Sequence, residues 1–157
     1  MTKSSESAKA DDVLKLDNQL CFAVYAAAHA FTATYKPLLE PLGLTYPQYL
    51  AMLVLWQEDG VTVSAIGSRL GLDSGTLTPL LKRLEAAGLV SRIRDAADER
   101  QLRITLTAPG RALKQKAKGI PEGLLCASGM SLGEVGALRA KLESLADNLR
   151  AYAAESD

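Results

Sequence analysis

Two cysteines, Cys21 and Cys126, are the side chains of this 157-residue sequence best suited to redox chemistry. Only a thiolate attacks a peroxide efficiently, and a free cysteine with a pKa of about 8.5 is only a few per cent ionised at neutral pH. Cys21 is followed by Phe22 and several alanines, with no lysine or arginine in the next two helical turns. A thiolate there would need neutral donors, and phenol O–H groups can serve through hydrogen bonds to sulfur.

The same residues have a simpler interpretation. A lone cysteine on an apolar helix is more often an inert small hydrophobic side chain, and the residues alone favour that role for both cysteines. Tyr25, Tyr35 and Tyr46 would then be ordinary core or rim aromatics. Two cysteines are too few for a disulfide scaffold, and no cysteine–histidine cluster has metal-ligand spacing, so we expect neither a metal nor a cofactor.

Composition indicates a soluble globular chain. Of its residues, 48% are hydrophobic and 23% charged, and 18 basic residues balance 18 acidic ones. That length suits one compact domain or one protomer of an oligomer. No apolar run approaches the roughly 20 residues of a membrane helix, and residues 1–12 lack the apolar core of a secretory signal. We expect a flexible N-terminus over residues 1–12, no membrane association and a cytoplasmic location.

The balanced net charge conceals a segregation of charge along the chain. Residues 61–118 carry eleven basic and five acidic side chains, a net charge of +6. Residues 1–60 and 119–157 each carry a net charge of −3, from four basic against seven acidic and three against six. A basic middle between acidic ends fits a polyanion-binding module in another scaffold, although a solvated charged face is the commoner explanation.

The first half of the chain predicts helices separated by clear breaks. Apolar residues from about 12 to 39 recur at helical spacing, and Pro37, Pro41 and Gly43 end that helix. Thr45, followed by Pro47 and Gln48, forms a capping box that opens a strongly apolar helix over about 46–58.

The basic middle predicts a winged helix. Two short helices, 63–70 and 75–87, are separated by a glycine-containing turn, which matches a helix-turn-helix. Apolar and polar residues alternate in two segments, 89–94 and 101–106. These segments flank the polar loop 95–100 and predict a β-hairpin. In the second short helix a leucine stripe faces the core and leaves small polar groups and cations outside. The residues predicted to contact DNA are Ser74, Thr76, Thr78, Pro79, Lys82, Arg83, Arg92, Arg94 and Arg100.

Helices at both ends complete a mainly α fold with a small β-hairpin wing. A helix over about 108–128 and another from the capping box at Ser131 and Glu134 to about 152 follow the wing. The end helices carry more apolar surface than one small domain needs, so we expect them to pair with a second copy. Residues 13–157 are thus one domain, with dimerisation helices at 13–43 and 108–153 around a DNA-binding region at 44–107. A dimer would place its recognition helices about 34 Å apart on a palindromic operator.

Three motifs resemble the MarR family of dimeric winged-helix repressors over residues 14 to 128 or so. They are the stretch 44–49, the run 72–85, and Asp98-Glu99-Arg100 in the loop of the wing. The segment 16–23, which holds Cys21, resembles that of the organic hydroperoxide resistance regulators within this family.

The resemblance implies a repressor that leaves its operator when an organic hydroperoxide oxidises Cys21. It implies that Tyr25, Tyr35 and Tyr46 hydrogen-bond the sulfur, some of them from the other subunit. It also implies that Cys126 resolves the oxidised cysteine through an intersubunit disulfide. Asp98 and Arg100 would shape the wing, where the alternative is an exposed salt bridge worth about 0–1 kcal/mol.

Other functions remain open at this point. The nearest alternative is a winged-helix repressor released by a small aromatic ligand bound at the dimer interface. A thiol peroxidase is disfavoured, because no Thr-x-x-Cys motif and no nearby arginine accompany Cys21. A structural DNA-binding protein without operator preference is the third alternative.

Overall fold

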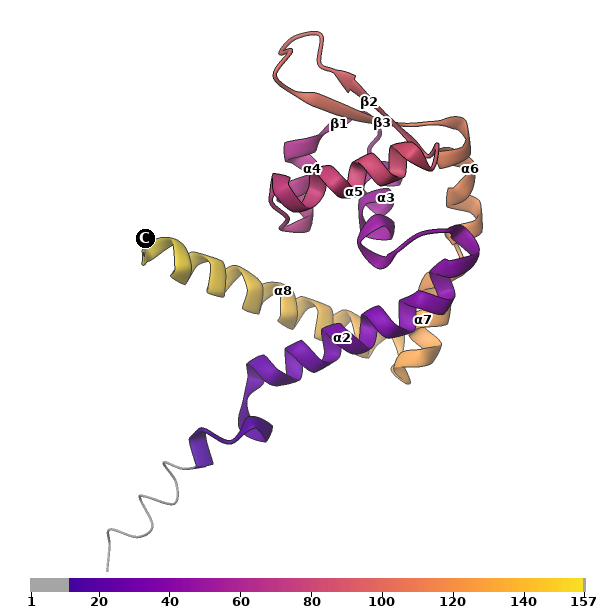
Figure 1. The fold of residues 1–157 in the computed structure, drawn as a ribbon. Helices are drawn as coiled ribbons and strands as arrows, with labels where there is room; N and C mark the ends of the chain where they lie inside the picture. The colour runs from indigo at the N-terminus through magenta and orange to yellow at the C-terminus, as the bar shows by residue number, and fades with distance from the viewer. Residues whose placement is uncertain (1–11, 157) are drawn as a thin grey trace, which may run out of the picture. The chain divides into compact units, whose positions relative to one another are not determined.

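The computed structural model describes residues 12–156, and its contacts divide the chain into two units after Lys114. The first unit holds the helix-turn-helix, the sheet and the helices before them (Figure 1). Its elements are η1 (Leu16–Asn18), α2 (Leu20–Leu39), η2 (Glu40–Leu42), α3 (Tyr46–Gln57), β1 (Val61–Thr62), α4 (Val63–Leu70), α5 (Ser74–Ala86), β2 (Val90–Arg94) and β3 (Leu102–Leu106). Helix α6 (Ala108–Ala117) ends in the second unit, which holds α7 (Ile120–Ser128) and α8 (Leu132–Glu155).

The prediction of one helix over residues 12–39 is wrong at its start. The backbone of Gln19 is extended, and its side chain donates to the carbonyls of Val13 (2.6 Å) and Lys15 (3.0 Å). This side chain holds a separate turn before α2, which begins only at Leu20. Cys21 is therefore the second residue of α2 and does not lie in mid-helix. Of the predicted flexible N-terminus, residues 1–11 lie outside the described residues.

Helix α3 carries much of the core of the first unit. The predicted capping box is confirmed, since Thr45 Oγ1 accepts from the Gln48 N–H (3.4 Å) and Gln48 Oε1 accepts from the Thr45 N–H (2.9 Å). Met52 and Leu55 are fully buried. The Trp56 indole N–H donates to the Gly110 carbonyl (2.9 Å), which ties the start of α6 to α3. Most of the buried hydrophobic residues thus lie within the winged helix.

The predicted helix-turn-helix is confirmed as α4 and α5. Gly71 ends α4 with φ +65°, a left-handed conformation that favours glycine. At Gly67 a Cβ atom would lie 2.8 Å from the Leu72 carbonyl oxygen, so only glycine permits this tight turn. The leucine stripe of α5 is buried, as predicted; its members are Leu77, Leu80, Leu81 and Leu84.

The predicted wing is confirmed as the antiparallel pair β2 and β3. Ser91 lies opposite Thr105, and Arg92 lies opposite the buried Ile104. The two-residue strand β1, absent from the sequence-based prediction, pairs with the other edge of β3, so the sheet order is β1-β3-β2. Strand β2 is therefore an edge strand of this sheet.

The C-terminal helices differ from prediction in one respect. The expected continuous helix over 108–128 is wrong, because the chain turns at Gly119 and restarts as α7 with Pro121 in its first turn. The capping box of α8 is confirmed at Ser131 and Glu134. Within residues 12–156 no helix is both long and apolar enough to cross a membrane.

Candidate functional site

Cys21 occupies the exposed first turn of α2. No side chain caps this end of the helix, because the Gln19 amide is held by the preceding turn. The first N–H groups of an α-helix lack intrahelical partners, and the positive end of the helix dipole lies beside them. Cys21 therefore lies at the end of α2 where backbone N–H groups are left without helical acceptors. Within one chain, Cys21 is therefore not packed as a buried hydrophobic side chain.

Tyr25 follows Cys21 by one helical turn on the same face of α2. Its side chain is 61% exposed, and its ring lies against His29 with centroids 4.3 Å apart. The structure therefore places one of the three predicted tyrosines beside the cysteine. Among residues 12–156, no group of three or more metal-ligating side chains gathers in one place.

Tyr35 and Tyr46 lie together at the other end of α2. Their rings stack at 4.4 Å with an angle of 11° between planes, and Tyr49 packs against Tyr35 at 5.6 Å. Burial, followed by the neighbouring phenols Tyr46 and Tyr49, raises the pKa of Tyr35 to about 12. Burial also raises the pKa of Tyr46. Both hydroxyls thus remain protonated donors at neutral pH.

The structure does not bring Cys21 to Tyr35 within one chain. The two residues are fourteen positions apart on one helix, which corresponds to about 21 Å along its axis. Cys126, the second predicted redox residue, is exposed near the end of α7 in the second unit.

Both end helices present apolar side chains to solvent. Large exposed hydrophobic residues on α2 are Leu20, Phe22, Val24, Tyr25 and Phe31. On α8 they are Leu132, Leu138, Leu142, Leu149 and Tyr152, and none of the residues described in α8 is buried. Apolar faces of this extent on a single chain mark interaction surfaces.

The recognition helix α5 presents its predicted DNA contacts on an accessible face. Asp73 caps the helix by accepting from the Thr76 N–H (2.8 Å), and this bond, the largest cause, lowers the pKa of Asp73. Thr78 is half-buried beside the leucine stripe. The remaining predicted contacts of α5 are exposed: Ser74, Thr76, Pro79, Lys82 and Arg83.

The three predicted arginines of the wing differ in their surroundings. The Arg100 side chain is 95% exposed and lies 3.6 Å from Asp98 Oδ1, which also accepts the Arg100 N–H at 3.1 Å. Arg94 is exposed and donates to the Glu99 carbonyl (3.2 Å). Arg92 is half-buried in an ion pair with Glu85 of α5, with 2.7 Å between Nε and Oε2.

An ion pair at the base of the wing escaped the sequence analysis. Asp95 is buried, accepts the Ala97 N–H (2.7 Å) and pairs with Arg103, which also donates to the Gly60 carbonyl (2.7 Å). These bonds, led by that from Ala97, lower the pKa of Asp95. Asp59 similarly accepts the Leu106 N–H (2.8 Å), although it lies 47 residues away. Asp95 and Arg103 lie on opposite sides of the hairpin loop in the sequence. Their opposite charges were the sequence signal from which this ion pair could have been predicted.

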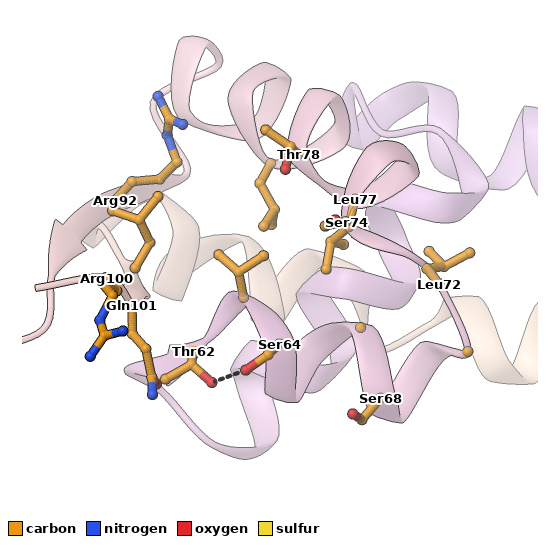
Figure 2. A pocket seen from close by; sticks show the side chains of 15 residues that line it. Thr62, Ser64, Ser68, Leu72, Ser74, Leu77, Thr78, Arg92, Arg100 and Gln101 are labelled. Carbon is orange, nitrogen blue, oxygen red and sulfur yellow. Dashed lines mark hydrogen bonds between the residues drawn. The ribbon is translucent and has the colours of Figure 1, made fainter. Parts of the chain in front are cut away.

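A pocket of about 620 Å³ lies between α4, α5 and the wing. Figure 2 shows the linked hydroxyls of Thr62 and Ser64 beside Gln101, with the Arg92 guanidinium on the opposite side, toward α5. Four residues predicted to contact DNA line this concavity: Ser74, Thr78, Arg92 and Arg100. The helix-turn-helix and the wing thus line one shared concavity.

Comparisons with known proteins agree with this architecture. Residues 33–117 match the family described as transcriptional regulator SarA/Rot. The chain is 57% identical over 147 residues to the HTH-type transcriptional regulator TtmR of Methylorubrum extorquens, covering 94% of this chain and 75% of TtmR. It is 49% identical over 138 residues to the organic hydroperoxide resistance transcriptional regulator of Bacillus subtilis, covering 88% of this chain and 94% of that regulator.

Solved structures of AbfR from Staphylococcus epidermidis show the same fold. Reduced AbfR bound to DNA matches with a TM-score of 0.72 at 39% identity, covering 90% of this chain and 99% of AbfR. AbfR structures also include an overoxidised form bound to DNA and a disulfide form. TtmR and the Bacillus subtilis protein are both transcriptional regulators, which confirms the prediction that this chain is a regulator and not an enzyme. This chain belongs to the SarA/Rot-type group of MarR-family winged-helix transcriptional regulators.

Proposed function

We propose that this regulator represses transcription as a homodimer and is released from a palindromic operator when an organic hydroperoxide oxidises Cys21. The observation that carries the proposal is the position of Cys21, exposed in an uncapped helix start and surrounded by unpaired apolar side chains. Such an exposed, apolar site gives an alkyl peroxide access to the sulfur. The relative named for organic hydroperoxide resistance supports the choice of inducer.

The first chemical step is a two-electron oxidation of the sulfur. The Cys21 thiolate attacks the distal peroxide oxygen, an S–O bond forms, and the O–O bond breaks. The alkoxide leaving group takes a proton and departs as an alcohol, which leaves a sulfenic acid on Cys21. Phenol O–H groups of Tyr25, and of Tyr35 and Tyr46 from the partner subunit, donate to the sulfur before the attack.

The second step forms a disulfide with Cys126 of the other protomer. Its thiol attacks the sulfenic sulfur, an S–S bond replaces the S–O bond, and the oxygen departs as water. A covalent link between helices of two protomers strains the dimer and rotates the winged helices out of register with the operator. Because overoxidised AbfR has been solved with DNA bound, we assign release to the disulfide rather than to overoxidation of this cysteine.

DNA binding is assigned to the concave surface formed by α5 and the wing. The exposed Ser74 and Thr76 and the half-buried Thr78, at the start of α5, would reach base edges in the major groove. Lys82 and Arg83 would contact phosphates, while Arg94 and Arg100 would reach the backbone or the adjacent minor groove.

A gel-shift experiment with cumene hydroperoxide tests the proposal. Wild-type protein and Cys21→Ser should bind a palindromic operator equally well in reductant, and only the wild type should leave it after oxidation. Release of Cys21→Ser by the peroxide would contradict the sensing role of this residue. Release of both proteins by a small aromatic ligand, with no response to peroxide, would instead support a ligand-sensing repressor.

A further inference from the structure

The ion pair between Glu85 and Arg92 connects the recognition helix to the wing. Arg92 donates to Glu85 twice, from Nε to Oε2 (2.7 Å) and from its backbone N–H to Oε1 (3.2 Å). Glu85 belongs to the last turn of α5, and Arg92 is the third residue of β2. One carboxylate therefore fixes both the side chain and the backbone of the strand.

Two physical features make this pair more consequential than an ordinary surface salt bridge. Strand β2 is the edge of the sheet, so an N–H group pointing away from β3 has no strand partner, and Glu85 accepts the one at Arg92. A carboxylate near the C-terminal end of a helix is also disfavoured by the helix dipole, and the arginine compensates for this. The pairing therefore gives the free N–H group of β2 an acceptor and compensates the negative charge at the end of α5.

We infer that Arg92 is a positioning residue, which holds the wing at a fixed angle to α5, and that it does not contact a DNA phosphate. Its guanidinium is turned toward α5 and is already neutralised by Glu85. Arg94, two positions along the same strand face, is exposed and bonds only to a backbone carbonyl. Of the two arginines on β2, Arg94 is thus the one available to phosphate. The inference rests on the DNA-binding part of the proposed function.

The salt dependence of operator binding distinguishes the two roles. Loss of a phosphate contact lowers the slope of log affinity against log salt by about one per contact, whereas loss of a positioning residue leaves the slope unchanged. We expect Arg92→Gln and Glu85→Gln each to weaken binding about three- to tenfold at constant slope. The matched control Arg94→Gln should weaken binding and reduce the slope.

Two further variants test the pairing itself. Arg92→Gln in combination with Glu85→Gln should cost no more than either change alone. The exchange of both residues, Glu85→Arg with Arg92→Glu, should recover part of the affinity, because opposite charges again join the two elements. A lower slope for Arg92→Gln, or an exchange variant that binds more weakly than Arg92→Gln, would overturn the inference.

Amide hydrogen exchange provides a measurement that does not depend on DNA. Glu85→Ala should accelerate exchange across β2, most clearly at Arg92, while the buried leucine stripe of α5 keeps its protection. Unchanged exchange in β2 would overturn the inference even where the operator is bound normally. If the wild type fails to bind any palindromic duplex while exchange in β2 responds as expected, the proposed function fails and the positioning role stands.

Discussion

The rings of Tyr35 and Tyr46 stack 4.4 Å apart, at the end of α2 opposite to Cys21. The helix between Cys21 and Tyr35 spans about 21 Å, so no rotamer of Tyr35 reaches the sulfur of its own chain. If these phenols activate Cys21, they do so across a dimer in which the α2 helices run in opposite directions. The proposed sensing site therefore needs two copies of the chain.

Mixed dimers test this arrangement directly. A heterodimer of a Cys21→Ser protomer and a Tyr35→Phe protomer retains one complete site if the tyrosine acts across the interface, and none if it acts within its chain. We expect about half the wild-type amount of peroxide-reactive thiol at the wild-type rate. The Tyr35→Phe homodimer should react about tenfold more slowly, because each sulfur loses one donor.

The absence of any rapidly reacting thiol in the heterodimer would contradict the crossed arrangement. A heterodimer of wild-type and Cys21→Ser protomers is the matched control, since it also holds one intact cysteine site.

Cys126 is predicted to act only in the second step, after Cys21 has been oxidised. Cys126→Ser should still form a sulfenic acid at Cys21, but the covalent dimer should disappear from non-reducing gels. Operator release by peroxide should also become much weaker in this variant, because the disulfide is the step assigned to release. A covalent dimer that persists in Cys126→Ser would show that another thiol resolves Cys21, such as Cys21 of the second protomer.

The aromatic cluster predicts a loss of stability at alkaline pH. Because the pKa of Tyr35 rises from 10.0 to about 12 on folding, the folded state prefers the protonated phenol. This contribution is complete below pH 10 and is lost as the pH rises toward 12. Urea unfolding should show a steeper fall in the free energy of unfolding above pH 10 for the wild type than for Tyr35→Phe. If the free energy of unfolding fell equally steeply with pH in both proteins, Tyr35 would be excluded as the source of the alkaline loss of stability.

The base of the wing predicts the opposite dependence on pH. The pKa of Asp95 is held below its ordinary value of 3.8 by the Ala97 N–H and by Arg103, so its contribution is present above that value and is lost as the pH falls through the folded-state pKa. Asp95→Asn should lower Tm by about 2–6 °C at pH 7 and by less in acid. The exposed pair Asp147–Arg150 supplies the control, since Asp147→Asn should change Tm little.

Local sequence rules predict much of this fold, because its helix ends and turns use local chemistry. The capping boxes at Thr45 and Ser131 and the tight turn at Gly71 each involve residues within a few positions of one another. The leucine stripe of α5 likewise follows from helical periodicity alone.

The errors arise where a side chain acts outside its own element. Helical periodicity continues through Gln19, and only the bonds from its side chain to earlier carbonyls reveal the break that exposes Cys21. The sequence pattern of the wing predicts that Arg92 contacts DNA. In the structure its guanidinium is instead paired with Glu85, seven residues earlier. The Asp59 bond to Leu106 spans 47 residues and has no local signal.

In the proposed function, operator release depends on the oxidation of one sulfur, that of Cys21. Stepwise addition of an organic hydroperoxide to the protein on a fluorescent operator measures release by anisotropy. Mass spectrometry of the same samples, with a sulfenic-acid probe, measures the fractions of Cys21 present as sulfenic acid and as the disulfide with Cys126. We predict that the released fraction follows the fraction of Cys21 held in the disulfide with Cys126 and reaches completion near one equivalent of peroxide per site. Complete formation of the Cys21–Cys126 disulfide with the operator still bound, or release while Cys21 stays reduced, would contradict this proposal.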